Sequence, residues 1–155
     1  MSMKELLPQP DKLLYALRRI GYSLEHSLSD LLDNSITAGA KKVTLRFIFD
    51  DDKVTHIAII DDGNGMDGST VDEAMRFGSD LERPLDGLGK FGMGMKLASL
   101  GHASDLIVLT KKASLLNGRE WTDESIADGW KCGVLEDKEI RSALKRVGST
   151  LAGKN

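Results

Sequence analysis

The stretch THIAIIDDGNGM, residues 55–66, governs the interpretation of this sequence. Its apolar run at 57–60 has the length and composition of a buried strand. The strand delivers the carboxylate of Asp61 directly into a turn that contains Gly63 and Gly65. A strand holds Asp61 rigidly, and glycines let the backbone approach a flat ligand because no Cβ intervenes. The stretch therefore predicts the floor of a ligand-binding site. Taken alone, it could also be an ordinary hairpin turn rich in Asp and Gly.

A helix is predicted at residues 24–38, with Ser23 as its N-cap. Leucines and Ser35 gather on one side of this helix, whereas Asp30 and Asn34 lie one turn apart on the other side. An amphipathic helix with its polar face in water would explain the pattern. This polar face, however, carries only short side chains and no Lys or Arg, whereas a solvated face usually carries both. It is therefore a candidate functional surface.

A third stretch, GLGKFGMGMK at residues 87–96, leads into a predicted helix. Backbone N–H groups in a glycine-rich segment before a helix can bind an anion, and Lys90 and Lys96 add positive charge. The stretch lacks the Gly-Lys-Ser/Thr of a P-loop. It also does not follow an early strand, as a dinucleotide-binding fingerprint would. Both common phosphate-binding folds are therefore disfavoured.

Together the three stretches resemble the superfamily of gyrase, heat-shock chaperone, histidine kinase and mismatch-repair (GHKL) ATPases. The resemblance covers roughly residues 22–111. Within the superfamily, RFGS at 76–79 and the strand ending in LTK at 109–111 most resemble the microrchidia-type branch. The resemblance implies an α/β two-layer sandwich of the Bergerat type, in which helices cover one face of a mixed, mostly antiparallel sheet.

The resemblance also implies roles for individual residues. Asp61 would accept a hydrogen bond from the adenine amine, which suits a group that only accepts. Asn34 would ligate Mg²⁺ through its amide oxygen. Asp30 would be the general base that orients water; the family usually has Glu there, so the shorter Asp30 predicts slow hydrolysis. The other nucleotide-contacting positions that the resemblance implies are Gly63, Gly65, Met66, Gly89, Lys90, Phe91, Gly92, Met93, Gly94, Lys96 and Thr110.

Composition limits the class of protein. The 155 residues predict one domain, with an N-terminal arm and helix at 1–21 and the ATP-binding domain at 22–155. A net charge of −3 gives no sign of a nucleic-acid or membrane surface, and nucleic acid is left open as a partner. The single Cys132 and the lack of a signal peptide predict a reducing, cytoplasmic location.

The function expected from the resemblance is an Mg²⁺-dependent ATPase module. Its lid, the mobile loop predicted at 78–89, would close on ATP and drive conformational change or homodimerisation of a larger protein. A C-terminal transducer domain would follow this chain. A nucleotide-binding switch without turnover is the alternative that the short Asp30 favours. A histidine-kinase catalytic domain is a weaker alternative, because no phosphoacceptor helix precedes residue 10.

The rest of the chain predicts further secondary structure from its hydrophobic periodicity and its turn residues. The predicted elements are helices at 11–20, 71–77, 91–100 and 137–146, strands at 43–49, 54–61, 104–111, 130–135 and from about 149, and a hairpin turn at 117–118.

Overall fold

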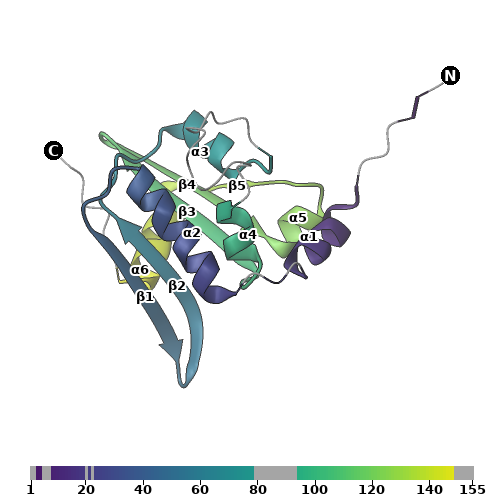
Figure 1. Cartoon of the computed structure of the whole chain (residues 1–155). Helices are drawn as coiled ribbons and strands as arrows, with labels where there is room; N and C mark the ends of the chain where they lie inside the picture. The colour runs from purple at the N-terminus through teal and green to yellow at the C-terminus, as the bar shows by residue number, and fades with distance from the viewer. Residues whose placement is uncertain (1–2, 5–7, 20, 22, 79–93, 149–155) are drawn as a thin grey trace.

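The computed structural model describes residues 3–4, 8–19, 21, 23–78 and 94–148. Six helices and five strands lie in this part of the chain (Figure 1). The helices are α1 (Pro10–Arg18), α2 (Leu24–Thr37), α3 (Gly68–Met75), α4 (Gly94–Leu100), α5 (Asp123–Ala127) and α6 (Asp137–Arg146). The strands are β1 (Val43–Asp50), β2 (Lys53–Asp61), β3 (Asp105–Lys112), β4 (Leu115–Thr122) and β5 (Gly133–Val134).

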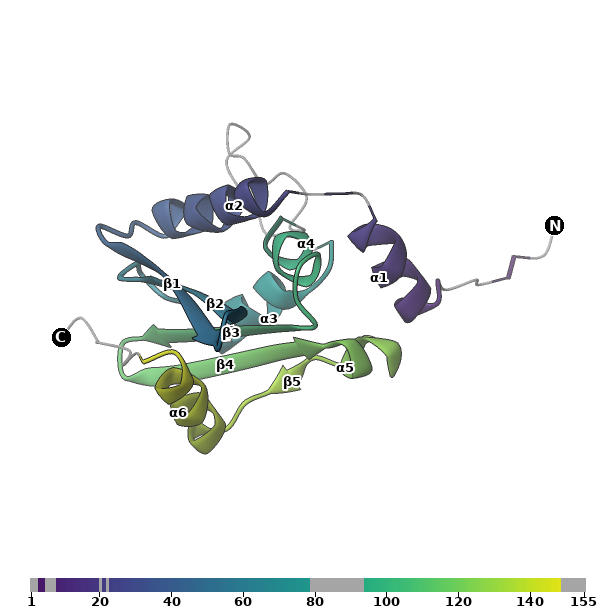
Figure 2. The same ribbon diagram turned by 90° about the horizontal axis from the view of Figure 1, so that it is seen from below.

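The strands form two antiparallel sheets in the described residues. One is the β1–β2 hairpin, whose register pairs Val43 with Asp61 and Asp50 with Lys53. The other has the strand order β3-β4-β5. Figure 2 shows α2 and α4 on one side of β3 and β4, with α6 on the opposite side. The expected α/β architecture with antiparallel sheets is confirmed, and α6 adds a helix on the second face.

Alternation along β4 explains how helices pack on both of its faces. Trp121 and Arg119 contact α3 through Met75 and Asp72. Gly118 faces the other way, and a Cβ there would lie 2.9 Å from the Ile140 side chain of α6. The glycine therefore allows α6 to approach the strand closely.

The prediction of a hairpin turn at 117–118 is wrong. Both residues lie inside β4, and the turn lies at Ala113 and Ser114, because Lys112 pairs directly with Leu115. Ala113 adopts a φ of 53°, the left-handed conformation that such a tight turn requires. The Asn-Gly pair resembled a turn signal, but its glycine serves helix packing.

Most other elements agree with the sequence to within a few residues. The helix predicted at 137–146 has the bounds of α6. The strand predicted at 130–135 is reduced to the two residues of β5, and α5 was not predicted. The strand expected from about 149 lies outside the described residues. None of the helices in the described part of the chain is both long and apolar enough to span a membrane.

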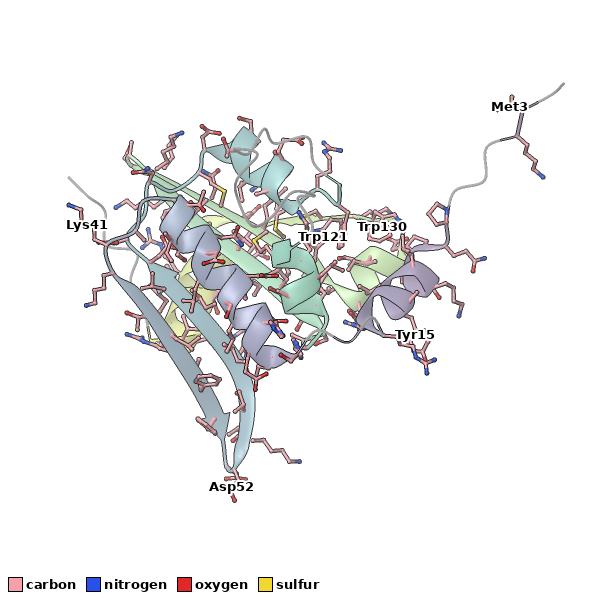
Figure 3. All side chains as sticks on the ribbon, viewed as in Figure 1. Met3, Tyr15, Lys41, Asp52, Trp121 and Trp130 are labelled. Carbon is pink, nitrogen blue, oxygen red and sulfur yellow. The ribbon has the colours of Figure 1, made fainter. Side chains whose placement is uncertain are left out.

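The core lies between β3–β4 and the helices α1, α3, α4 and α5. Its buried side chains are Leu14, Val71, Met75, Leu100, Leu106, Trp121 and Ile126. The rings of Phe77, Trp121 and Trp130 meet edge to face, with centroids 5.0 to 6.3 Å apart. Figure 3 labels the two tryptophans of this cluster. This cluster lies at the end of α3, where Trp121 Nε1 donates to the carbonyl of Met75.

Candidate functional site

The carboxylate of Asp61 is held by two hydrogen bonds at the end of β2. The Ser35 hydroxyl of α2 donates to Oδ2 at 3.0 Å, and the backbone N–H of Gly63 donates to Oδ1 at 2.9 Å. Ser35 is 4% exposed, while Asp61 is exposed. The side chain of Asp61 is thus oriented and still open to a ligand. Ser35 was not among the predicted site residues, and a serine within the leucine side of the helix was the signal that could have found it.

Residues 61–66, here called the Asp61 turn, are built as one unit with the end of α2. The backbone N–H of Asn64 donates to the carbonyl of Ala38 at 2.9 Å. Asp62 Oδ1 accepts from the backbone N–H groups of Lys41 and Lys42 at 2.7 and 2.9 Å. A Cβ on Gly63 would lie 2.9 Å from that of Ala38. The first two sequence motifs therefore meet directly in the fold.

The Asp61 turn also packs against the end of β3. Gly65 has a φ of 66°, and a Cβ there would collide with the carbonyl of Lys111. The N–H of Met66 donates to Thr110 Oγ1 at 2.8 Å, and Thr110 is 5% exposed. Met66 itself is half-buried against the core. The structure thus brings together five of the predicted nucleotide-contacting positions: Asp61, Gly63, Gly65, Met66 and Thr110.

The polar side of α2 faces α4 rather than water. Ser27 is 1% exposed, and its hydroxyl lies 3.1 Å from His102 Nε2, just after α4. Asp30 and Asn34 are half-buried on the same side. A Cβ on Gly94, the first residue of α4, would lie 3.8 Å from Asp30 Oδ2. The predicted general base and the predicted metal ligand therefore line the contact between the two helices.

Side-chain oxygens that could bind a metal ion lie at this contact between α2 and α4. Carboxylate and amide oxygens are the protein ligands that suit Mg²⁺, which also keeps waters and binds substrate phosphates. The pair Asp30 and Asn34, one turn apart, fits that chemistry, and the assignment of Asn34 as the metal ligand stays a prediction. In the described residues no group of three or more His, Cys, Asp or Glu side chains forms a separate metal site.

Lys96 is buried at the start of α4. Its side chain is 1% exposed, and its ammonium donates to the carbonyls of Ala74 and Arg76 at 2.7 and 2.8 Å. The sequence analysis had placed this positive charge beside the phosphates. The other predicted positions in this stretch, Gly89, Lys90, Phe91, Gly92 and Met93, lie outside the described residues.

Asp67 anchors α3 directly after the Asp61 turn. Its Oδ1 accepts from the N–H of Thr70 at 2.9 Å and the Thr70 hydroxyl at 2.7 Å, and its Oδ2 from Lys112 Nζ at 2.9 Å. These bonds, those from Thr70 foremost, hold the pKa of the Asp67 carboxyl well below its usual range. The N-terminus of α3 is thereby attached to β3, which carries Thr110.

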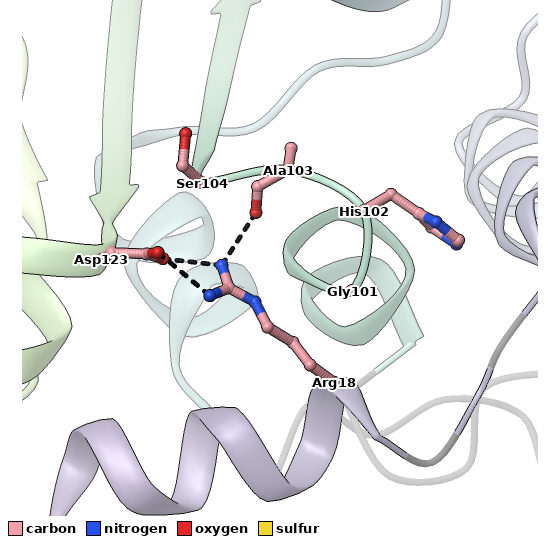
Figure 4. Close-up of a pocket in the computed structure, with 6 residues that line it drawn as sticks. All are labelled: Arg18, Gly101, His102, Ala103, Ser104 and Asp123. Atoms are coloured by element: carbon pink, nitrogen blue, oxygen red, sulfur yellow. Dashed lines mark hydrogen bonds and ion pairs between the residues drawn. The ribbon is translucent and has the colours of Figure 1, made fainter.

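A shallow hollow near the end of α4 is a different feature (Figure 4). The guanidinium of Arg18 lies in it and donates to both carboxylate oxygens of Asp123, at 2.6 and 3.0 Å. Arg18 also donates to the carbonyls of Leu100 and Ala103 at 2.6 and 3.0 Å. The hollow is therefore the place where α1 is attached to α4 and α5.

Comparisons with known proteins place the whole site within one matched family profile. The profile described as "Histidine kinase-, DNA gyrase B-, and HSP90-like ATPase" matches residues 22–153. MORC family CW-type zinc finger protein 1 of Homo sapiens is 33% identical over 91 residues, which are 56% of this chain and 9% of that protein. Its counterpart in Mus musculus is 32% identical over 91 residues, 56% of this chain and 10% of that protein. The match therefore spans about a tenth of the length of these relatives.

Proposed function

The chain belongs to the family of histidine kinase-, DNA gyrase B- and HSP90-like ATPases, and from this premise we propose that it binds Mg²⁺-ATP between α2, the Asp61 turn and α4. The observation that carries the proposal is the orientation of Asp61. Ser35 and Gly63 each donate to one of its oxygens, and the remaining lone pairs can accept from the amine of adenine. Gly63 and Gly65 let the turn pack closely on Ala38 and on the carbonyl of Lys111, which fixes the position of Asp61.

Phosphates and Mg²⁺ would lie on the α4 side of Asp61. Asn34 would hold the ion, and bound Mg²⁺ would neutralise charge that develops on the phosphates. The backbone amides at 91–94, together with Gly89 and Lys90, would bind the phosphates. Asp30, opposite Gly94, would orient the attacking water as general base.

We propose slow hydrolysis. Asp30 is one methylene shorter than the Glu usual at this position, so its water would lie farther from the γ-phosphate, and small misplacements cost about 100-fold in rate. The second candidate, a nucleotide-binding switch without turnover, is favoured by the same observation. If the unaltered chain hydrolyses ATP at steady state faster than an Asp30→Ala variant, the chain is an ATPase and not a switch without turnover.

We propose that this domain acts within a longer protein, in which ATP closes the segment at 78–89 and drives dimerisation or another conformational change, with a transducer domain after this one. The similarity to the MORC proteins supports the microrchidia-type branch. We also propose the reducing, cytoplasmic location that the single Cys132 predicts.

Calorimetry with Asp61→Asn tests the proposed adenine contact. The amide would present a donor or a weaker neutral acceptor to the adenine amine, so binding of Mg²⁺-ATP should fall by about 100-fold or more. Asp52→Asn, at the far tip of the β1–β2 hairpin (Figure 3), is the matched control and should bind ATP as the unaltered chain does. Unchanged ATP affinity in a folded Asp61→Asn variant would refute the proposal.

A further inference from the structure

Lys96 is a buried cation whose position is fixed by protein groups. Its ammonium donates to the carbonyls of Ala74 and Arg76 and lies 5.9 Å from the centre of the Phe77 ring. Burial of an ammonium is costly unless such partners compensate. Withdrawing the ammonium toward a ligand would remove the donor from two carbonyls, so this geometry favours a fixed role.

The carbonyls that Lys96 binds belong to the end of α3. The last carbonyls of a helix have no partner within the helix, and a cation stabilises them. The intervening carbonyl, that of Met75, accepts from Trp121 Nε1 at 3.0 Å. Three consecutive carbonyls at the end of α3 are thus bound by side chains of α4 and β4.

The two helices that Lys96 joins carry opposite ends of the proposed site. The Asp61 turn leads directly into α3, which Asp67 attaches to β3. The first residue of α4, Gly94, lies opposite Asp30 on α2. The distance between the adenine end and the phosphate end therefore depends on how α3 and α4 are joined.

We infer that Lys96 is a positioning residue that sets the spacing between the Asp61 turn and α4 without contacting the nucleotide. The inference rests on the proposed function, because it assigns a role within the same site. It predicts that Lys96 matters for the triphosphate and not for adenosine, because adenosine needs only the Asp61 turn.

The test compares Mg²⁺-ATP and adenosine by calorimetry on the unaltered chain, Lys96→Met and Lys96→Arg. Lys96→Met should lose about tenfold in ATP affinity, because the end of α3 loses two charged hydrogen bonds that join it to α4, and keep its adenosine affinity within about twofold. Lys96→Arg should also lose ATP affinity, because a planar guanidinium does not fit a buried site shaped for an ammonium. Full ATP affinity in Lys96→Arg would overturn the inference.

Trp121→Phe is the second variant, and it needs no change at Lys96. It removes the donor to Met75 but keeps an aromatic ring, so it should lower ATP affinity in the same direction, by about threefold, and leave adenosine unaffected. If Lys96→Met fails to fold, as thermal unfolding would show, Lys96→Arg and Trp121→Phe carry the same expectation. Equal losses for ATP and adenosine would indicate a structural role only and would overturn the inference.

The unaltered chain separates the two proposals. If it binds neither ATP nor adenosine, the proposed function fails, and the inference fails with it. If it binds both and the Lys96 variants bind ATP equally well, the inference alone fails.

Discussion

The Asp61 turn and the α2–α4 contact form the two ends of the proposed site, and they are held in different ways. Backbone groups and glycines that admit no side chain hold much of the turn, as at Gly65 against the carbonyl of Lys111, and the side chains of Ser35 and Thr110 complete it. Side chains hold the other end, through Ser27 and His102 and through Lys96. An end of the site that close backbone packing holds tolerates few substitutions. An end that side chains hold can change its properties by substitution of those side chains. We therefore expect changes in the turn to abolish binding and changes at α2–α4 to alter rate or triphosphate affinity.

The strongest test of this comparison is Asp30→Ala, which should separate rate from affinity. Loss of the proposed general base should lower ATP turnover by about 100-fold or more, while the affinity for Mg²⁺-ATP stays nearly unchanged. Asp30→Glu should keep the affinity and either raise the rate or leave it unaltered. Brisk turnover in Asp30→Ala, measured at saturating ATP, would contradict the assignment of the base.

Gly65→Ala should damage the turn most. The new Cβ would collide with the carbonyl of Lys111 at a φ of 66°, so we expect destabilisation of about 3 kcal/mol and loss of ATP binding. Gly94→Ala is the matched substitution at the other end, where a Cβ would lie 3.8 Å from Asp30 Oδ2, an ordinary contact. Urea unfolding should show a change within about 1 kcal/mol for Gly94→Ala; equal destabilisation of both variants would remove the contrast.

Ser35→Ala should lower affinity for adenosine and ATP alike, by about tenfold, because Asp61 Oδ2 loses its donor. Ser27→Ala removes a similarly buried hydroxyl of α2 that contacts His102 instead. It should destabilise the protein without changing adenosine affinity. Calorimetry with adenosine compares the two serines directly, and equal losses would show that the orientation of Asp61 does not depend on Ser35.

The smallest effect should be the pH dependence of stability that Asp67 provides. Hydrogen bonds from Thr70 lower the folded-state pKa of Asp67, so its stabilisation is present above the unfolded-state pKa of about 4 and is lost as pH falls through the lowered pKa. The difference in unfolding free energy between the unaltered chain and Asp67→Ala should therefore shrink as pH falls below about 4. A difference that is independent of pH would contradict this assignment.

The sequence predicted the parts of the site that depend on local pattern. Asp61 at the end of an apolar run and the short-chained polar side of α2 were both recognisable, because strand and helix periodicity fix which residues share a face. Asp30 beside Gly94 and Ser35 beside Asp61 are contacts across 64 and 26 residues of sequence, which no local pattern contains.

One error arose where a residue type serves two purposes: Gly118 resembled a turn residue but provides space for α6. Lys96 resembled a phosphate ligand, and in the structure its ammonium donates to carbonyls at the end of α3. Charge and flexibility are visible in the sequence, whereas the direction in which a side chain is buried depends on the neighbouring helices.

The attachment of α1 has a practical consequence for anyone shortening this chain. The family match begins at residue 22, and a boundary drawn there would remove Leu14 from the core and Arg18 from the carbonyls of Leu100 and Ala103. Such a truncation would open an apolar surface next to α4, and aggregation of the shortened chain would then reflect the chosen boundary rather than a flaw in the nucleotide site.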